Sequence, residues 1–449
     1  MTRTVIISHS HPALRYGGGE VAAHRQFQHM LAGGEDVYFV GSTIGPEDGA
    51  RFFGPAQRVL SFSDRDFCLR GLGMDAFVME HPRIETEDWL LDFLLALEGD
   101  VYHFHHFWNI GAGTLRRLRA ARPQAQMICT LHEMTAICAN HGQMVKTSGE
   151  LCHAASDVAC AACLKRSPAD FMLRRARMAG MLDLFDVLLS PSQFMADRFE
   201  AWGTAPGRVG VIENGLDQGD APPVQSQADL TRRSRRFAFF GQATPTKGLD
   251  VLIRATQEID AQMRAQDVAP PVAAPAKASA RSAPRAAVPT APLAPISLEI
   301  YGVTAEGFAA LWPALTPPDW VRFRGRYRPQ DCIAIMRRFG WIVIPSVWWE
   351  NSPVVIQEAR AAGTPMIASD IGGMAEKTAG WGVQFPVGDP DALASAILSV
   401  HDRPEILAQH IALIAPPLDM AGFMEEWRVA CGTEEARRHP ERRRPARVD

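Results

Sequence analysis

The chain has 449 residues, which at roughly 150 residues per domain favours two or three domains. With 47% hydrophobic and 21% charged residues, it can form ordinary globular cores, which excludes a wholly disordered or collagen-like polymer. Lys and Arg total 46 against 50 Asp and Glu, and the net charge of -4 gives no global reason to expect a nucleic-acid partner.

Apolar runs in the sequence are short. The run at 5–7 is shorter than the core of a signal peptide. The runs at 89–97 and 182–189 are broken by aspartates and fall far below the ~20 apolar residues that span a bilayer. We therefore expect a cytoplasmic protein, attached at most to the inner face of the plasma membrane. The eight cysteines are then expected to be thiols or metal ligands rather than disulfides.

Short apolar strands alternate with helical stretches along the whole chain, which predicts an α/β fold with two parallel sheets covered by helices. The expected strands are 4–8, 36–41, 100–104, 126–131, 187–190 and 209–212 in the first half, and 236–240, 297–301, 321–324, 341–344, 365–368 and 383–385 in the second. The stretch around Phe62–Leu72 is expected to be a loop.

Composition shifts suggest the domain boundaries. A polar, turn-rich stretch at 214–223 predicts a hinge between domains 1–214 and 220–403. Helices at 404–431 are expected to pack back toward the N-terminal domain. The Ala/Pro-rich stretch 265–295 predicts a disordered insertion.

The Arg-rich tail 433–449 is also expected to be disordered. Two interpretations of the tail stay open. It either contacts anionic lipid headgroups or an acidic partner, or it is a solvated terminus without a role.

Three glycines, Gly17 to Gly19, follow the first strand and precede Glu20 and a helix. Glycines there allow a ligand phosphate to approach the backbone and the helix N-terminus. The motif fits only the loose form of the dinucleotide fingerprint and lacks the G-K-[ST] of a P-loop. A tight strand-to-helix turn explains the same residues.

A second glycine turn opens the second half, where Gly241 and Gln242 follow a strand and Lys247 and Gly248 precede a helix. A lysine at the carboxyl edge of a parallel sheet is well placed to bind phosphate. The alternative is a solvated surface lysine.

The most specific motif is Glu350-Asn351-Ser352-Pro353 followed by Glu358. Glu350 lies in a loop that leaves a strand, and Pro353 suits the first turn of the following helix, which carries Glu358. Two carboxylates at a sheet edge can accept hydrogen bonds from sugar and ribose hydroxyls. Glu358 could instead be an ordinary exposed helix residue.

Taken together, these motifs and the glycine pair Gly372-Gly373 resemble the retaining family-4 glycosyltransferases of GT-B architecture, over about residues 4 to 430. The resemblance implies two Rossmann-like domains that face each other across a cleft. It implies transfer of a sugar from a nucleoside-diphosphate sugar to an acceptor hydroxyl with retention. We expect the pathway to be bacterial polysaccharide or glycoconjugate synthesis.

The resemblance also implies site residues. Lys247 would contact the donor diphosphate, beside Gly241 and Gln242, and Glu358 the ribose. Glu350, with the amides of Asn351 and Ser352, would hold the donor sugar. Gly18 and Gly19 would approach the diphosphate or the acceptor. The implied chemistry requires no cofactor.

One residue departs from the family pattern, because most members carry Arg where this chain has Gln242. This departure leaves a second function open. The protein could be a catalytically weak partner that binds sugar nucleotide or glycan.

A histidine-rich strand end contains His103 and His105, which alternation places on one face. They match the family's His-x-His signature, which implies that His105 lies near the donor sugar and takes part in catalysis with Lys247 and Glu350, while His103 is more buried. A structural role for His105 is the alternative.

Four cysteines lie within the stretch 138–163, namely Cys138, Cys152, Cys160 and Cys163. A Cys-x2-Cys pair with two further thiols can form a tetrahedral structural zinc site, and some bacterial family members carry a similar insertion. Four unligated thiols are the alternative.

The acceptor, a glycan or a lipid-linked sugar, is expected to bind the first domain. The segment 171–178 mixes arginines with apolar residues and could lie on a membrane surface. A helix packed on the sheet with exposed arginines explains the same pattern.

Overall fold

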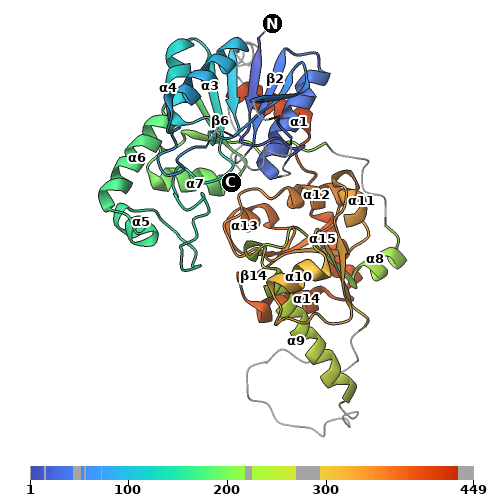
Figure 1. Ribbon diagram of the computed structural model, residues 1–449. Coiled ribbons are helices and arrows are strands. Elements are labelled where there is room, and N and C mark those ends of the chain that lie inside the picture. The colour runs from blue at the N-terminus through green and yellow to red at the C-terminus, as the bar shows by residue number, and fades with distance from the viewer. Residues whose placement is uncertain are drawn as a thin grey trace. The chain divides into compact units, whose positions relative to one another are not determined.

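The computed structural model (Figure 1) describes residues 2–14, 17–43, 52–54, 57–71, 73–217, 225–268 and 294–432. The chain divides into two compact units. The first unit comprises Met1–Gln218, Trp348–Val354 and Pro417–Asp449, and the second Gly219–Val347 and Val355–Pro416. Most of the predicted insertion 265–295, part of the predicted hinge and the whole tail 433–449 lie outside the described residues.

The first unit contains an eight-stranded sheet in the order β3-β4-β2-β1-β5-β6-β7-β8. Its neighbours pair in parallel, except for the antiparallel pair β3 and β4. The strands are β1 Thr4–Ile7, β2 Val37–Ser42, β3 Val59–Ser63, β4 Asp66–Leu69, β5 Val101–Phe104, β6 Gln126–Thr130, β7 Val187–Ser190 and β8 Val209–Val211.

The hairpin of β3 and β4 corrects the prediction of a loop at Phe62–Leu72. β3 is mostly exposed, and β4 begins with the charged residue Asp66. Neither strand therefore has the apolar run that marks the other strands. β4 nevertheless pairs in parallel with β2, and its Cys68 and Leu69 are buried.

Helices accompany this sheet in the alternating pattern of an α/β fold. They are α1 Gly18–Ala32, α3 Ile84–Ala96, α4 Ala112–Ala121, α5 Asp157–Leu164, α6 Pro168–Leu182, α7 Gln193–Trp202 and α16 Met420–Ala430. The last of these packs into the core of the first unit, where Met424 and Trp427 join Ile6, Phe27 and Phe39.

The second unit contains a six-stranded sheet in the order β11-β10-β9-β12-β13-β14, all parallel. Its strands are β9 Arg236–Phe240, β10 Ser297–Tyr301, β11 Val321–Gly325, β12 Trp341–Ile344, β13 Met366–Ser369 and β14 Val383–Phe385. The predicted α/β fold with two parallel sheets is thus confirmed.

The helices of the second unit follow the same alternation. They are α8 Gln227–Arg233, α9 Leu249–Val268, α10 Ala305–Leu311, α11 Cys332–Met336, α12 Val354–Ala362, α13 Gly372–Thr378, α14 Pro390–Val400 and α15 Pro404–Ala412, with short 3-10 turns at Pro245–Lys247 and Pro329–Asp331. Apolar residues of β9, β10, β12, α9 and α14 form the main core.

Each sheet has a point where the strand order reverses, between β1 and β5 in the first unit and between β9 and β12 in the second. In open parallel sheets, ligands bind outside the carboxyl ends of the strands at such points. The loops after these four strands are therefore where a site is expected, and they carry most of the residues singled out in the sequence.

The two units differ from the sequence-based boundaries at two places. The segment Trp348–Val354 groups with the first unit, because Trp349 and Asn351 bond to residues of that unit. Of the two C-terminal helices, α16 groups with the first unit, whereas α15 packs against α8 in the second.

Candidate functional site

The glycine loop before α1 packs closely on polar side chains. Oε1 of the buried Glu20 lies 3.0 Å from Nε2 of His9. A Cβ on Gly17 would lie 2.4 Å from the same carboxylate, and one on Gly19 would lie 3.2 Å from the His132 ring. A carboxylate already occupies the positive end of α1, so this loop is less suited to a second anion than the sequence suggests.

His105, at the end of β5, is hydrogen-bonded through both ring nitrogens. Its Nδ1 lies 2.9 Å from Nε2 of His132, and its Nε2 lies 3.0 Å from Oε1 of Gln26. Because Gln26 accepts through Oε1, the proton of His105 is on Nε2, and His132 donates to Nδ1. His105 is buried, whereas His132 keeps some exposure.

Burial keeps these imidazoles neutral. It lowers the pKa of His103 and of His132 to about 3 and that of His105 well below its usual value, with smaller contributions from neighbouring histidines. His103 is buried beneath them and bonds Thr130 at 2.8 Å. The imidazole that reaches the surface at this strand edge is therefore His132, supported from behind by His105.

A second imidazole beside them is held by a carboxylate. The backbone N–H of Trp108 donates to Nδ1 of His106 at 2.7 Å, so Nε2 of His106 donates to Glu133 at 2.8 Å. The other oxygen of Glu133 accepts from Thr135. His106 stacks obliquely on His9, with 4.6 Å between the ring centroids.

The segment that carries the Glu350 motif is firmly bonded within the first unit. Trp348 Nε1 donates to Oε1 of the buried Glu350 at 2.9 Å. Asn351 accepts from the Ser192 hydroxyl and donates to the carbonyl oxygen of His132 at 3.2 Å. The Ser352 hydroxyl is buried without a hydrogen-bond partner among the described residues. Asn351, the chain neighbour of Glu350, therefore contacts the backbone at His132.

Lys247 lies in the turn that joins β9 to α9 in the second unit. The turn requires glycine at Gly248, where φ is +64° and a Cβ would lie 1.9 Å from the carbonyl oxygen of Pro345. The backbone N–H of Val347 donates to Thr246 at 2.9 Å. The loops after β9 and β12 are thus bonded together at the switch point. Gly241 directly follows β9, and Gln242 beside it is exposed.

Glu358 is a buried residue of α12, contrary to the alternative of an exposed helix residue. Its Oε2 accepts from the thiol of Cys332 at 3.3 Å. Burial and the neighbouring carboxylate raise the pKa of this thiol far above its usual value, so it remains a neutral donor. A buried carboxylate beside a sheet edge is suited to binding hydroxyl groups.

The four cysteines of the stretch 138–163 are all free thiols and lie near one another. Burial raises the pKa of Cys138 and of Cys160, and Cys152 contributes to both shifts. Within the described ranges, however, no three of the four sulfurs come within 4.8 Å of one another. The arrangement as it stands does not form a four-thiolate site.

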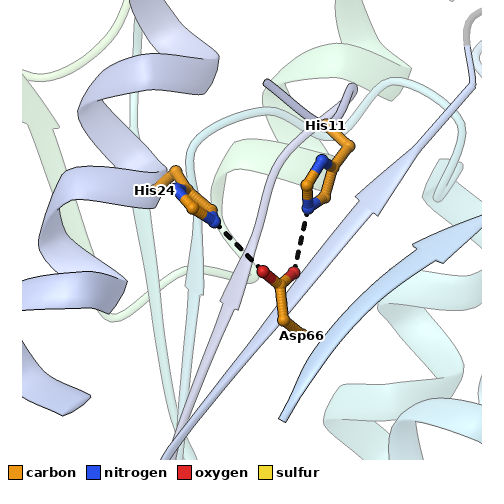
Figure 2. Close-up of side chains that lie close together, drawn as sticks. All are labelled: His11, His24 and Asp66. Carbon is orange, nitrogen blue, oxygen red and sulfur yellow. Dashed lines mark hydrogen bonds and ion pairs between the residues drawn. The ribbon is translucent and has the colours of Figure 1, made fainter. Parts of the chain in front are cut away.

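One histidine–carboxylate cluster does come together in the described part of the chain, and Figure 2 shows it. Asp66 accepts from His11 at 2.9 Å and from His24 at 3.1 Å. The backbone N–H of Ala13 donates to Nδ1 of His11, so the ring proton is on Nε2, the atom that a metal would need. The cluster is therefore a hydrogen-bonded network around a buried carboxylate.

The helix that contains 171–178 is packed on one side and exposed on the other. Phe171, Arg174 and Met178 are buried in α6, whereas Met172 and Leu173 are exposed. Among the described residues, no helix is long and apolar enough to span a membrane.

Three residues of this site did not stand out in the sequence. His132 follows the end of β6. A histidine at the carboxyl end of a strand is what marked His105 at the neighbouring strand, and the same criterion would have marked His132. Gln26 and Trp349 gave no such signal, because their roles arise from contacts with segments 79 and 197 residues away in the chain.

Comparisons with known proteins agree with the fold and the motifs. Residues 16–219 match the family described as Glycosyltransferase Family 4, and residues 234–403 match the family described as Glycosyl transferases group 1. The HepE protein of Anabaena, solved in complex with UDP, covers 95% of this chain and 98% of its own at a TM-score of 0.57 and 14% identity. Sucrose-phosphate synthase of Thermosynechococcus elongatus covers 98% of this chain and 99% of its own, at a TM-score of 0.56 and 16% identity.

Curated relatives include D-inositol 3-phosphate glycosyltransferases. That of Corynebacterium efficiens is 27% identical over 45% of this chain and 44% of its own length. That of Mycobacterium sp. (strain KMS) is 25% identical over 68% of this chain and 56% of its own length. The chain thus spans about half the length of these relatives.

The fold, with its two parallel sheets and the loops at their switch points, is the GT-B fold of glycosyltransferases. Within that class, the chain belongs to family 4. This membership confirms the family that the Glu350 and Lys247 motifs suggested.

Proposed function

We propose that the protein transfers a sugar from a nucleoside-diphosphate sugar to an acceptor hydroxyl, with retention at the anomeric carbon. The observation that supports this most directly is the bonded segment of Glu350 and Asn351 beside His132. This segment carries the buried carboxylate of Glu350 and the buried Ser352 hydroxyl, which has no hydrogen-bond partner among the described residues, and it is bonded to the backbone of His132. Such groups suit the hydroxyls of a sugar.

In this proposal Lys247 and the turn at Gly248 bind the diphosphate, and Glu358 binds the ribose. As the sugar–phosphate bond breaks, negative charge develops on the departing diphosphate, and stabilising it is the main electrostatic task. Lys247 and the N-terminus of α9 would meet this charge without a divalent ion. His132 would face the reacting sugar in its neutral form, with His105 fixing its orientation.

The acceptor is proposed to bind the first unit near the glycine loop at Gly18 and Gly19. Because Glu20 already occupies the positive end of α1, this loop favours a hydroxyl-bearing acceptor over the diphosphate. The curated relatives are named for inositol 3-phosphate, a phosphorylated polyol, and in this proposal the hydroxyls of the acceptor, not an anionic group, face the glycine loop. A role in polysaccharide or glycoconjugate synthesis is part of the proposal.

The proposal also includes a peripheral membrane contact through α6. The exposed Met172 and Leu173 of α6 lie near the exposed Arg175, and such a surface suits an anionic membrane that carries a lipid-linked acceptor. Sedimentation with phosphatidylglycerol vesicles tests it. Binding that Met172→Ser/Leu173→Ser abolishes would support the contact, and no sedimentation of the wild type would contradict it.

A thermal-shift panel of UDP-, GDP-, ADP- and dTDP-sugars tests the donor. Ligand at a hundred times its dissociation constant adds about 2.7 kcal/mol, which raises the melting temperature by a few degrees. We expect one nucleotide class to stabilise the wild type and Glu306→Ala, an exposed control on α10, but not Glu358→Ala.

The second function, a catalytically weak binding protein, rests on Gln242 in place of Arg. It predicts a shift with one nucleotide but no release of sugar from the donor. Gln242→Arg would then restore turnover. Without any shift from any donor, the proposed function is wrong.

A further inference from the structure

The indole ring of Trp349 is held on several sides by residues of the first unit. Its ring stacks on Phe194 with 5.6 Å between centroids and meets His153 edge-on at 5.2 Å. The guanidinium of Arg198 lies 4.5 Å from the ring centroid. The indole Nε1 donates to the carbonyl oxygen of Cys152 at 3.1 Å. We call Cys152, His153, Phe194 and Arg198 the Trp349 clamp.

The members of the clamp also hold one another. Arg198 donates to the carbonyl oxygen of His153 at 2.6 Å, and its guanidinium lies 5.0 Å from the ring of Phe194. One cation therefore contacts two aromatic rings and fixes the backbone of the cysteine-rich stretch. Cation–π and stacked geometries of this kind stabilise an arrangement beyond simple apolar burial.

The helix that supplies half of the clamp also holds the other side of Glu350. Phe194 and Arg198 lie on α7, whose N-cap residue Ser192 donates to the side chain of Asn351. Trp349 and Asn351 are the two neighbours of Glu350 in the chain. The backbone of Glu350 is thus flanked on both sides by residues that contact α7.

We propose that Trp349 is a positioning residue for Glu350, and that the clamp holds the segment around Glu350 in place through α7 and the residues Cys152 and His153. The inference rests on the proposed function, in which Glu350 holds the donor sugar. The positioning role rests on the contacts at both sides of Glu350, since the Trp349 ring packs on Phe194 and Arg198 of α7, and Asn351 accepts from Ser192 at the start of the same helix. Misplacing a reacting group by about an ångström is enough to slow a reaction about 10²-fold.

The test compares Trp349→Ala and Trp349→Phe with a matched control, Trp202→Ala. Trp202 also lies on α7, and the described ring contact that it makes is with Phe199. Hydrolysis of the donor by water is followed with whichever sugar of the UDP, GDP, ADP and dTDP panel the wild type cleaves fastest, so no acceptor is needed. The affinity for the free nucleoside diphosphate is measured by calorimetry.

We expect Trp349→Ala to lower kcat about 10²-fold, while nucleotide affinity changes less than twofold. Trp349→Phe keeps the stacked ring and should recover most of kcat, and Trp202→Ala should stay within twofold of the wild type. Arg198→Ala should resemble Trp349→Ala. The double variant should lose no more than the worse single variant, since both act through one clamp.

Hydrogen exchange of the peptide 348–352, without ligand, provides a readout that does not depend on turnover. The proposal predicts faster exchange there in Trp349→Ala and Arg198→Ala, but not in Trp202→Ala. Near-normal kcat in Trp349→Ala would overturn the proposal, whether or not exchange changes. If the wild type cleaves no donor, the proposed function is wrong instead, and exchange alone decides whether the clamp orders this segment.

Discussion

The Nε2 atom of His132 donates to Nδ1 of His105 across 2.9 Å, and both rings are neutral. The Nε2–H group of His105 donates in turn to Oε1 of Gln26, so the chain of hydrogen bonds runs in one direction from the surface into the core. This direction leaves Nδ1 of His132 without a proton, as an acceptor. A neutral acceptor at this position can receive a hydrogen bond from a sugar hydroxyl.

Replacing His105 should therefore impair turnover without a change in nucleotide binding. In His105→Ala the ring of His132 loses its partner and turns, and we expect kcat to fall about 10²-fold. Since the pKa of His132 is about 3, the pair adds no inflection to the rate profile between pH 5.5 and 8. An inflection near pH 6.5 that disappears in His105→Ala would contradict this assignment.

Lys247→Ala tests the charge that stabilises the leaving diphosphate. Removing one such group typically slows the reaction about 10² to 10³-fold, and we expect a loss of this size in donor hydrolysis. Lys146→Ala is the matched control, because Lys146 is an exposed lysine of the first unit paired with Glu150. Equal rates in the two variants would remove Lys247 from the site.

Asp66 gives the first unit a pH-dependent stability. Burial alone would raise the pKa of this carboxyl, but the hydrogen bonds from His11 and His24 outweigh burial and lower it. A lowered pKa in the folded state stabilises the protein above the unfolded pKa of about 4, and this contribution is lost as the pH falls.

Asp66→Asn should therefore lower the free energy of unfolding at pH 7 by roughly 1–3 kcal/mol and flatten its dependence on pH between about 5 and 3. Urea unfolding at several pH values measures both effects. The exposed Asp64 lies on the same hairpin, and Asp64→Asn should leave both unchanged. A wild-type slope in Asp66→Asn would show that the acid sensitivity lies elsewhere.

The structural zinc at Cys138, Cys152, Cys160 and Cys163 remains a prediction that metal analysis can decide. If the site forms, protein purified without chelator carries about one zinc per chain, and replacing Cys160 with serine releases it. Replacing the buried Cys431 with serine serves as the control. Absence of zinc, together with thiols that all react with a thiol reagent after unfolding, would establish four unligated thiols.

The regular elements could be predicted because their burial is local. Runs such as Phe237–Phe240 and Trp341–Ile344 are apolar throughout, as strands covered on both faces must be. β3 and β4 were missed because an edge hairpin needs only one buried face, and Asp66 interrupts the little apolar pattern that it has.

The candidate site divides in the same way. Glu350, Glu358 and Lys247 stand in motifs with fixed spacing, so the sequence alone singled them out. His132 acquires its role from two distant partners, Gly19 and His105. Trp349 acquires its role from the Trp349 clamp. Contacts of this kind depend on which strand ends meet, and only the folded chain shows them.

The helix α16 has a consequence for the synthesis of the protein. Trp427 and Met424 complete a core whose other members, such as Ile6 and Phe27, emerge from the ribosome long before. About 200 residues separate β8 from α16, so at roughly 5–20 residues per second the nascent first unit waits some ten to forty seconds with part of its apolar surface uncovered. If the ribosome stalls within the second unit, this apolar surface stays uncovered, and transiently exposed surface of this kind is prone to aggregate.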